Sequence, residues 1–128
     1  MSTRACYTFI DSDNTFHVYK HHDGYPSGAA EFIKLAIAKA WKLPRFEAAD
    51  FGAAFVAANK DGGGGVYLTS HYRNHGDLEY RYEIGNDGTP GDFTPIVRAY
   101  RAQAGRKWKK FFEGGFDQLI EMATGTHD

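Results

Sequence analysis

Two histidines and an aspartate, which can bind metals or act as general acids and bases, stand together in HHDGYP, residues 21–26. His21 and His22 are adjacent, and adjacent side chains on a strand point to opposite faces. They are followed by an Asp-Gly turn and by a proline that fixes the backbone ahead of a helix. We interpret the segment as a strand-to-helix corner at the end of a sheet. A pocket at this corner would be lined by Arg4, His21, Asp23 and Tyr25.

A second group of metal-binding residue types lies in HYRNHGD, residues 71–77. His71, His75 and Asp77 could bind zinc or manganese. The spacing of the two histidines brings them together on a helix, whereas the composition of this segment is typical of a turn. The favoured interpretation therefore has no metal, no cofactor and no catalytic residue. The alternative is a metal-dependent hydrolase that uses His21, His71, His75 and Asp77.

Basic and aromatic residues are interleaved near the C-terminal end. Every charged residue between Asp92 and Glu113 is positive, although the whole chain has a net charge of −1. Cations contact phosphates and aromatic rings stack on bases, so this segment could bind a nucleotide or a single-stranded nucleic acid. The residues predicted to bind such a ligand are Arg98, Tyr100, Arg101, Arg106, Lys107, Trp108 and Lys109.

Two other interpretations of this basic segment remain open. Arg98 could pair across strands with Glu79 or Glu83, while the lysines form a solvated face. The cations could instead bind an acidic protein surface, since complementary charges guide association between proteins.

The segment LEYRYEI, residues 78–84, alternates strictly between apolar and charged side chains. This period predicts an antiparallel strand whose charged face meets water or a partner. If the strand lies at the edge of its sheet, it could pair with a strand of another protein or of a second copy. A protein–protein inhibitor or an oligomerisation module is therefore a further alternative function.

Two features that resemble functional motifs are interpreted as structural. The glycines of KDGGGG, residues 60–65, precede a strand, whereas phosphate-binding loops lead into a helix. Cys6 lies inside a predicted strand and is expected to be a buried core residue.

Because Cys6 is the only cysteine, the chain cannot form an internal disulfide, which is typical of proteins from a reducing compartment. With no apolar run of about 20 residues and no signal peptide, we expect a cytoplasmic protein without a membrane partner.

The elements that must position these residues follow from periodicity. With 128 residues, 42% of them hydrophobic, the chain has the size and composition of one globular domain. Strands are predicted over residues 5–10, 16–21, 66–72, 78–84 and 96–101, and helices over 28–42, 46–59 and 115–123. The first two strands should form one hairpin, and the next two a second. The expected fold is α+β: an antiparallel sheet of about five strands, two hairpins plus one, with two to three helices packed on one face.

The N-terminal part resembles a group of small phage and prophage proteins. The resemblance is carried by the start MSTR and by HHDGYP, which match an S-T-R or A-T-R start and a C/K-H-W-D-G-Y-P segment in that group. His22 stands where the group often has tryptophan. The match covers roughly the first 30 residues of the chain. It implies a mobile-element accessory protein acting in a bacterial cytoplasm, and no catalytic residue can be carried over from it.

These observations together lead us to expect a non-enzymatic accessory binding protein. Its ligand would be anionic, either a nucleotide-like small molecule or a nucleic acid, which the protein sequesters. Accessory genes of mobile elements often encode binders that block a host system, so the expected role is counter-defence, and a host protein is an alternative partner. A homo-oligomer is compatible with each of these functions.

Overall fold

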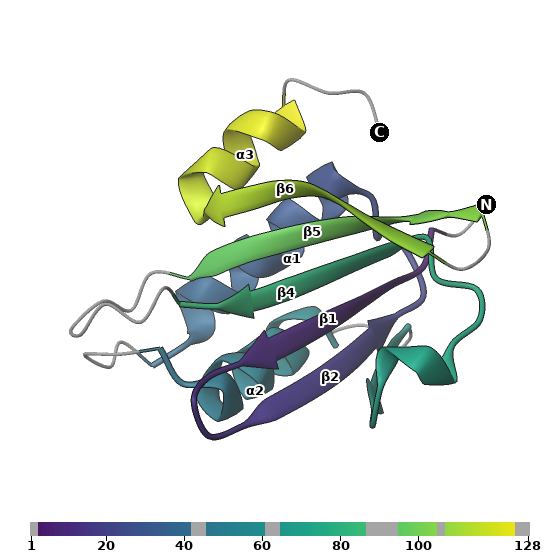
Figure 1. Cartoon of the computed structure of the whole chain (residues 1–128). Coiled ribbons are helices and arrows are strands. Elements are labelled where there is room, and N and C mark those ends of the chain that lie inside the picture. The colour runs from purple at the N-terminus through teal and green to yellow at the C-terminus, as the bar shows by residue number, and fades with distance from the viewer. Residues whose placement is uncertain (1–2, 42–45, 61–64, 87–94, 105–106, 125–128) are drawn as a thin grey trace.

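The computed structural model describes residues 3–41, 46–60, 65–86, 95–104 and 107–124. Its elements, in chain order, are β1 (Ala5–Ile10), β2 (Thr15–Lys20), α1 (Pro26–Lys39), α2 (Ala48–Asn59), β3 (Val66–Thr69), the 3-10 helix η1 (Tyr72–Asn74), β4 (Tyr80–Gly85), β5 (Ile96–Gln103), β6 (Lys107–Gly115) and α3 (Phe116–Thr124). The described strands form one six-stranded sheet in the order β3-β2-β1-β4-β5-β6. β1 and β4 are parallel, and the other neighbouring pairs are antiparallel. The fold is therefore α+β with a mixed sheet (Figure 1).

The helices pack on one face of the sheet and share a single core with it (Figure 1). Tyr7 and Phe9 of β1 are fully buried on this face, where their rings lie 4.7 and 5.3 Å from that of Phe55 in α2. α1 contributes Ile33 to the same core, and α3 contributes Leu119. Because side chains alternate along a strand, the intervening residues of β1 point to the opposite face, which carries no α-helix in the described part of the chain.

The helix boundaries follow the positions of the prolines and caps. α1 begins at Pro26, because a proline in the first turn has no N–H to satisfy and already has helical φ. Tyr25 is its N-cap, so the helix starts two residues before residue 28, where the sequence predicts it to start. The helix ends at Lys39, and Pro44 lies outside the described residues. No helix in the described ranges combines the length and apolar character that a membrane span requires.

The prediction of about five antiparallel strands is wrong in two respects. β6 was not expected, because Lys107, Lys109 and Lys110 interrupt any regular alternation there. The predicted second hairpin does not form, because β3 pairs with β2 whereas β4 lies between β1 and β5. β3 and β4 run in the same direction on either side of β2 and β1, so a tight turn cannot join them. Residues 70–79 make this connection and are called the crossover segment.

Candidate functional site

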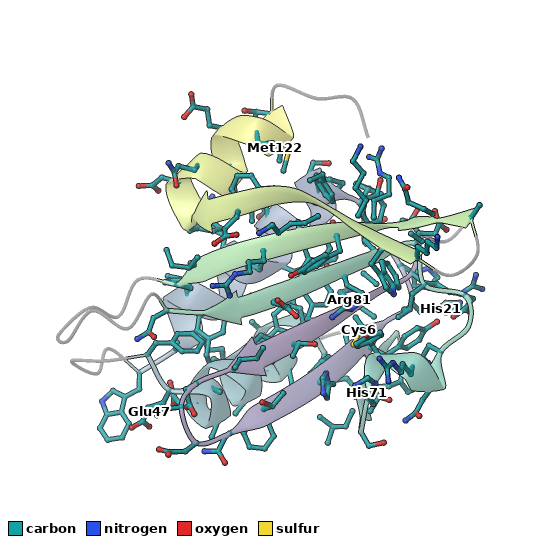
Figure 2. The ribbon with its side chains drawn as sticks, in the orientation of Figure 1. Cys6, His21, Glu47, His71, Arg81 and Met122 are labelled. Atoms are coloured by element: carbon teal, nitrogen blue, oxygen red, sulfur yellow. The ribbon has the colours of Figure 1, made fainter. Side chains whose placement is uncertain are left out.

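The crossover segment folds back over the sheet face that carries no helix. Its His75 ring stacks on Tyr19 of β2, with ring centroids 4.2 Å apart and planes inclined by 8°. Leu78 joins Tyr19 and Cys6 of β1 in a second, small buried cluster. Figure 2 shows Cys6 and Arg81 on this face of the sheet, with His71 of the crossover segment beside them. The segment therefore forms a wall on an otherwise open face.

Arg81 of β4 is a buried cation on this face, with only 8% of its surface exposed. Its guanidinium carbon lies 3.6 Å from the ring centroid of Tyr72, 4.9 Å from that of Tyr100 and 5.3 Å from that of Trp108. Glu83 accepts hydrogen bonds from Arg81 at 3.3 Å and from the Tyr100 hydroxyl at 3.0 Å. The prediction that the charged face of this strand meets water or a partner is therefore wrong for Arg81, which cation–π contacts and one carboxylate within the chain hold in place.

A concave site, called the site pocket, opens between the crossover segment and the adjoining ends of β5 and β6. Its volume is about 480 Å³, which is within the range of small-ligand sites. It is lined by Tyr72, Arg73, His75, Gly76, Leu78, Ala102, Gln103, Lys107 and Trp108. Arg73 and Lys107 are cations, and this described lining includes no carboxylate. The pocket thus combines aromatic rings, an amide and two positive charges, an arrangement that favours an anion with a flat apolar part.

Arg4 and His21 hold the crossover segment in place and do not line the site pocket. Arg4 Nε forms an ion pair with Asp77 Oδ2 at 2.9 Å and donates a hydrogen bond to His21 Nδ1 at 3.3 Å. The Tyr19 hydroxyl lies 3.0 Å from the same His21 nitrogen. Burial raises the pKa of Tyr19, so its hydroxyl stays protonated and donates to that nitrogen. This network joins the crossover segment to β2 and to the start of β1.

Asp23 and Tyr25 form the strand-to-helix corner that the sequence predicts. Asp23 has a φ of 59°, which turns the chain, and the Tyr25 hydroxyl donates to Asp23 Oδ1 at 3.2 Å. The Gly24 amide donates to the Thr3 carbonyl at 2.9 Å, and the Gly24 carbonyl accepts from the Tyr82 hydroxyl at 2.6 Å. Neither side chain lines the site pocket, so the corner serves to connect β2 with α1.

The sheet divides the predicted basic and aromatic residues between its two faces. Arg98 and Tyr100 alternate with core residues of β5, so they point to the face without helices, as does Trp108 of β6. Arg101 and Lys109 stand opposite one another and point to the helix side. The predicted set therefore does not form one continuous surface.

Two members of the predicted set, Lys107 and Trp108, line the site pocket, and Arg106 lies outside the described residues. The sequence interpretation missed Tyr72 and Arg73, which contribute the second ring and the second cation. Both lie in the segment that was interpreted as a turn. The signal available in the sequence was the adjacent Tyr-Arg pair, which repeats the aromatic-basic pairing seen near Trp108.

Arg98 forms a cross-strand ion pair, but the expectation that its partner is Glu79 or Glu83 is wrong. Arg98 Nε lies 3.5 Å from Glu113 Oε2 on β6, so in the described structure the pair joins β5 to β6 and not to β4. Lys110 also donates to Glu113. This hydrogen bond and the charge of Lys110 lower the pKa of Glu113, so the carboxylate stays ionised between the two cations.

The side chains proposed for a metal site are used for other contacts. His21 and His71 each accept a hydrogen bond at Nδ1, from Arg4 Nε at 3.3 Å and from the Arg73 amide at 3.1 Å. A neutral imidazole that accepts at Nδ1 carries its proton on Nε2 and has no lone pair left for a metal. Asp77 is paired with Arg4. Within the described part of the chain, no group of three or more His, Cys, Asp or Glu residues could hold a metal ion.

Cys6 is a core residue, as expected. Its side chain belongs to the small cluster under the crossover segment and is 1% exposed. Burial raises the pKa of the Cys6 thiol to about 12, so the thiol is protonated at neutral pH. Since the thiolate is the nucleophilic form, Cys6 is not suited to covalent catalysis.

A second concavity, called the apolar groove, lies on the helix side at the β3 edge of the sheet. It has a volume of about 480 Å³ and is lined by Phe16, Val18, Ala49, Gly52, Ala53, Val56, Ala57 and Leu68. Leu68 is 81% exposed, and β3 pairs only with β2 in the described sheet. The hypothesis that residues 78–84 offer a free strand edge is wrong, because β4 pairs on both sides. Among the described strands, β3 lies at an edge of the sheet instead.

Comparisons of the chain with protein-family models, with curated proteins and with solved structures find no match, so the function must be argued from the geometry of the site pocket.

Proposed function

We propose that the protein is a non-enzymatic accessory binding protein that holds an anionic ligand in the site pocket. The observation that carries this proposal is the pairing of two cations, Arg73 and Lys107, with two aromatic rings in a pocket whose described lining has no carboxylate. The ligand class is a nucleotide-like molecule or a nucleic acid. On the resemblance to phage and prophage proteins, we propose that it acts in a bacterial cytoplasm and opposes a host defence by sequestration.

The chemistry of the pocket matches the two parts of such a ligand. Arg73 and Lys107 are exposed and would donate charge-assisted hydrogen bonds to phosphate oxygens. Trp108 presents ring surface on which a base can stack, with Tyr72 edge to face beside it, and such stacking is sequence-tolerant because every base has a π-face. Arg81, beneath both rings, holds them in a fixed position, which lowers the ordering cost of binding.

The contacts of the reactive side chains favour binding over catalysis. The Cys6 thiol is buried and protonated, and the Nδ1 atoms of His21 and His71 are engaged by donors. His17 has a pKa lowered chiefly by burial, yet its Nδ1 lies 2.8 Å from the hydroxyl of Thr8, which is itself buried. His17 is only partly exposed, and its Nδ1 is engaged by this hydroxyl in the described structure.

Reversing the two pocket charges tests the proposal. Native mass spectrometry of the gently purified protein first establishes whether an anionic ligand is already bound. Calorimetric titrations with ATP and with pyrophosphate then measure the affinity of the pocket. The Arg73→Glu/Lys107→Glu variant is expected to bind at least about 100-fold more weakly, because two charge-assisted contacts become repulsive.

A matched control carries the same change of charge elsewhere. Lys34 and Lys39 are exposed on α1, on the other side of the sheet. The Lys34→Glu/Lys39→Glu variant should bind like the wild type. Equal affinities for the wild type and the pocket variant would show that the site pocket does not hold the anion.

Self-association is a second candidate function, which the apolar groove favours. Leu68 protrudes at the β3 edge beside a groove lined by apolar and small side chains, so a knob and a hole lie on the same surface. A second copy related by a two-fold axis can insert its Leu68 into this groove while the two β3 edges pair. No charged residue is among those that line the groove, so a second copy meets no unpaired charge there.

Replacing Leu68 by lysine should weaken this association by at least about tenfold, because each copy would bury a charge in an apolar groove. Sedimentation velocity over a range of concentrations measures the effect. Leu35, which is 43% exposed on α1, provides the control, and its Leu35→Lys variant should associate like the wild type. A wild-type chain that stays monomeric at every concentration would exclude this function.

A further inference from the structure

We propose that the site pocket takes a single nucleotide of small-molecule size and not a nucleic-acid strand. This inference rests on the proposed function, because it assumes that the pocket binds an anion. The pocket lining alone suits both a single nucleotide and a nucleic-acid strand, and the charges around the pocket distinguish these two ligand classes.

The first observation is that the other described cations over β4, β5, β6 and the start of β1, on the face opposite α1, α2 and α3, are paired with carboxylates. In the described part of this face, the pairs are Arg4 with Asp77, Arg81 with Glu83, and Arg98 and Lys110 with Glu113. Proteins that bind single strands without sequence preference use a positively charged groove that follows the backbone over several nucleotides. Here a strand leaving the pocket across β4, β5 and β6 would meet carboxylates between the cations, which repel phosphate.

The second observation is where the unpaired cations lie. Arg73 and Lys107 have no carboxylate partner among the described residues, and both line the site pocket. Arg101 and Lys109 also lack such a partner in the described ranges, but they point to the helix side of the sheet and do not line the site pocket. Among the described residues, the positive charge that the pocket presents to a ligand is thus that of Arg73 and Lys107, which suits about two negative charges.

The third observation is that the rings form one stacking corner and not a row. Tyr72 and Trp108 meet edge to face, with centroids 6.2 Å apart and planes inclined by 89°. Arg81 contacts both Tyr72 and Tyr100, at 3.6 and 4.9 Å from their ring centroids, and the His71 ring lies 4.4 Å from that of Tyr72, so Trp108 is the ring on which a base would stack. Successive bases of a strand need successive free rings. One corner in a pocket of about 480 Å³ fits one base with its phosphate.

The experiment compares mononucleotides with an oligonucleotide on the full chain. Calorimetric titrations use AMP, GMP, CMP and UMP as mononucleotides. The oligonucleotide is a single strand of about ten nucleotides without terminal phosphates, a length within the range of known single-strand binding sites. At least one mononucleotide is expected to bind at least about tenfold more tightly than the oligonucleotide. Its affinity should fall with salt as expected for about two ionic contacts, a much shallower dependence than a strand-tracking protein shows.

A variant outside the pocket separates the two ligand classes further. Arg98 lies on the path that a strand would follow across β5, and Arg98→Gln removes its charge without touching the pocket lining. Mononucleotide affinity should be unchanged in this variant, whereas Trp108→Ala should reduce it at least about tenfold through lost stacking.

Each outcome has a distinct meaning. An oligonucleotide that binds more tightly than every mononucleotide, with a loss of affinity in Arg98→Gln, overturns the inference and leaves the proposed function intact. Binding of neither probe, together with a gently purified protein that carries no anionic ligand, overturns both. Mononucleotide binding that is unaffected by Arg73→Glu/Lys107→Glu places the ligand elsewhere on the molecule and overturns both as well.

Discussion

The Gly24→Ala variant is expected to lose about 3 kcal/mol of unfolding free energy, because the new methyl group has no space. A Cβ added to Gly24 would lie 2.6 Å from the Cβ of Ala5 and 3.0 Å from the carbonyl oxygen of Thr3. Ala5 is fully buried at the start of β1, and Thr3 accepts the Gly24 amide, so neither can move away easily. The loss should appear as a lower midpoint in urea unfolding followed by circular dichroism, with an unchanged slope.

Gly76 provides the matched control for this substitution. A Cβ added there has no heavy atom within 4 Å, so Gly76→Ala adds the same methyl group to open space. Its unfolding free energy should stay within about 0.5 kcal/mol of the wild type. If both variants unfold at the wild-type midpoint, the corner is not packed as described and the junction between β2 and α1 must be looser.

Truncation of Phe55 to alanine should cost about 4 kcal/mol, the largest loss we expect from a single side chain. Phe55 is completely buried in α2 and its ring contacts those of Tyr7 and Phe9 on β1, at centroid distances of 4.7 and 5.3 Å. Its removal leaves a cavity between the helix layer and the sheet, and neighbouring rings cannot fill it without leaving their own positions. Urea unfolding measures the loss directly.

The same truncation at an exposed phenylalanine isolates the effect of burial. Phe16 on β2 is 43% exposed, so Phe16→Ala removes the same atoms from a site that already meets water. Its cost should be below about 1 kcal/mol. Similar losses at both positions would mean that Phe55 does not occupy the centre of the core.

The positions of two rings that line the site pocket depend on the buried arginine of β4. Arg81 lies under Tyr72 and Trp108, which line the pocket, and it is paired with Glu83. A buried cation is retained at a cost in desolvation, which its carboxylate and the surrounding rings offset. In this protein the arrangement fixes two rings from distant parts of the chain at one corner. Such a fixed corner is a favourable starting point for binding, because it needs little ordering.

Much of the local structure could be predicted from the amino-acid sequence. Alternation of period two indicated β2 and β4, and the 3.6-residue period indicated α1, whereas the other predicted strands and helices rested on composition and turn signals. HHDGYP indicated a corner, and the position of Cys6 within a predicted strand indicated burial. These features depend on residues that are neighbours in the chain, so periodicity and turn chemistry are sufficient to reveal them.

The order of the strands and the location of the site could not be predicted from the sequence. Nothing in the local pattern shows that β3 and β4 are separated by the β1–β2 hairpin, or that Lys107–Gly115 is a strand. Arg81 alternates as a solvent-facing residue should, yet it is buried because Tyr72 and Trp108, which are remote in sequence, fold over it. Strand pairing and burial depend on contacts between distant segments, and those contacts are set by the packing of the whole chain. The site pocket exists where three such segments meet.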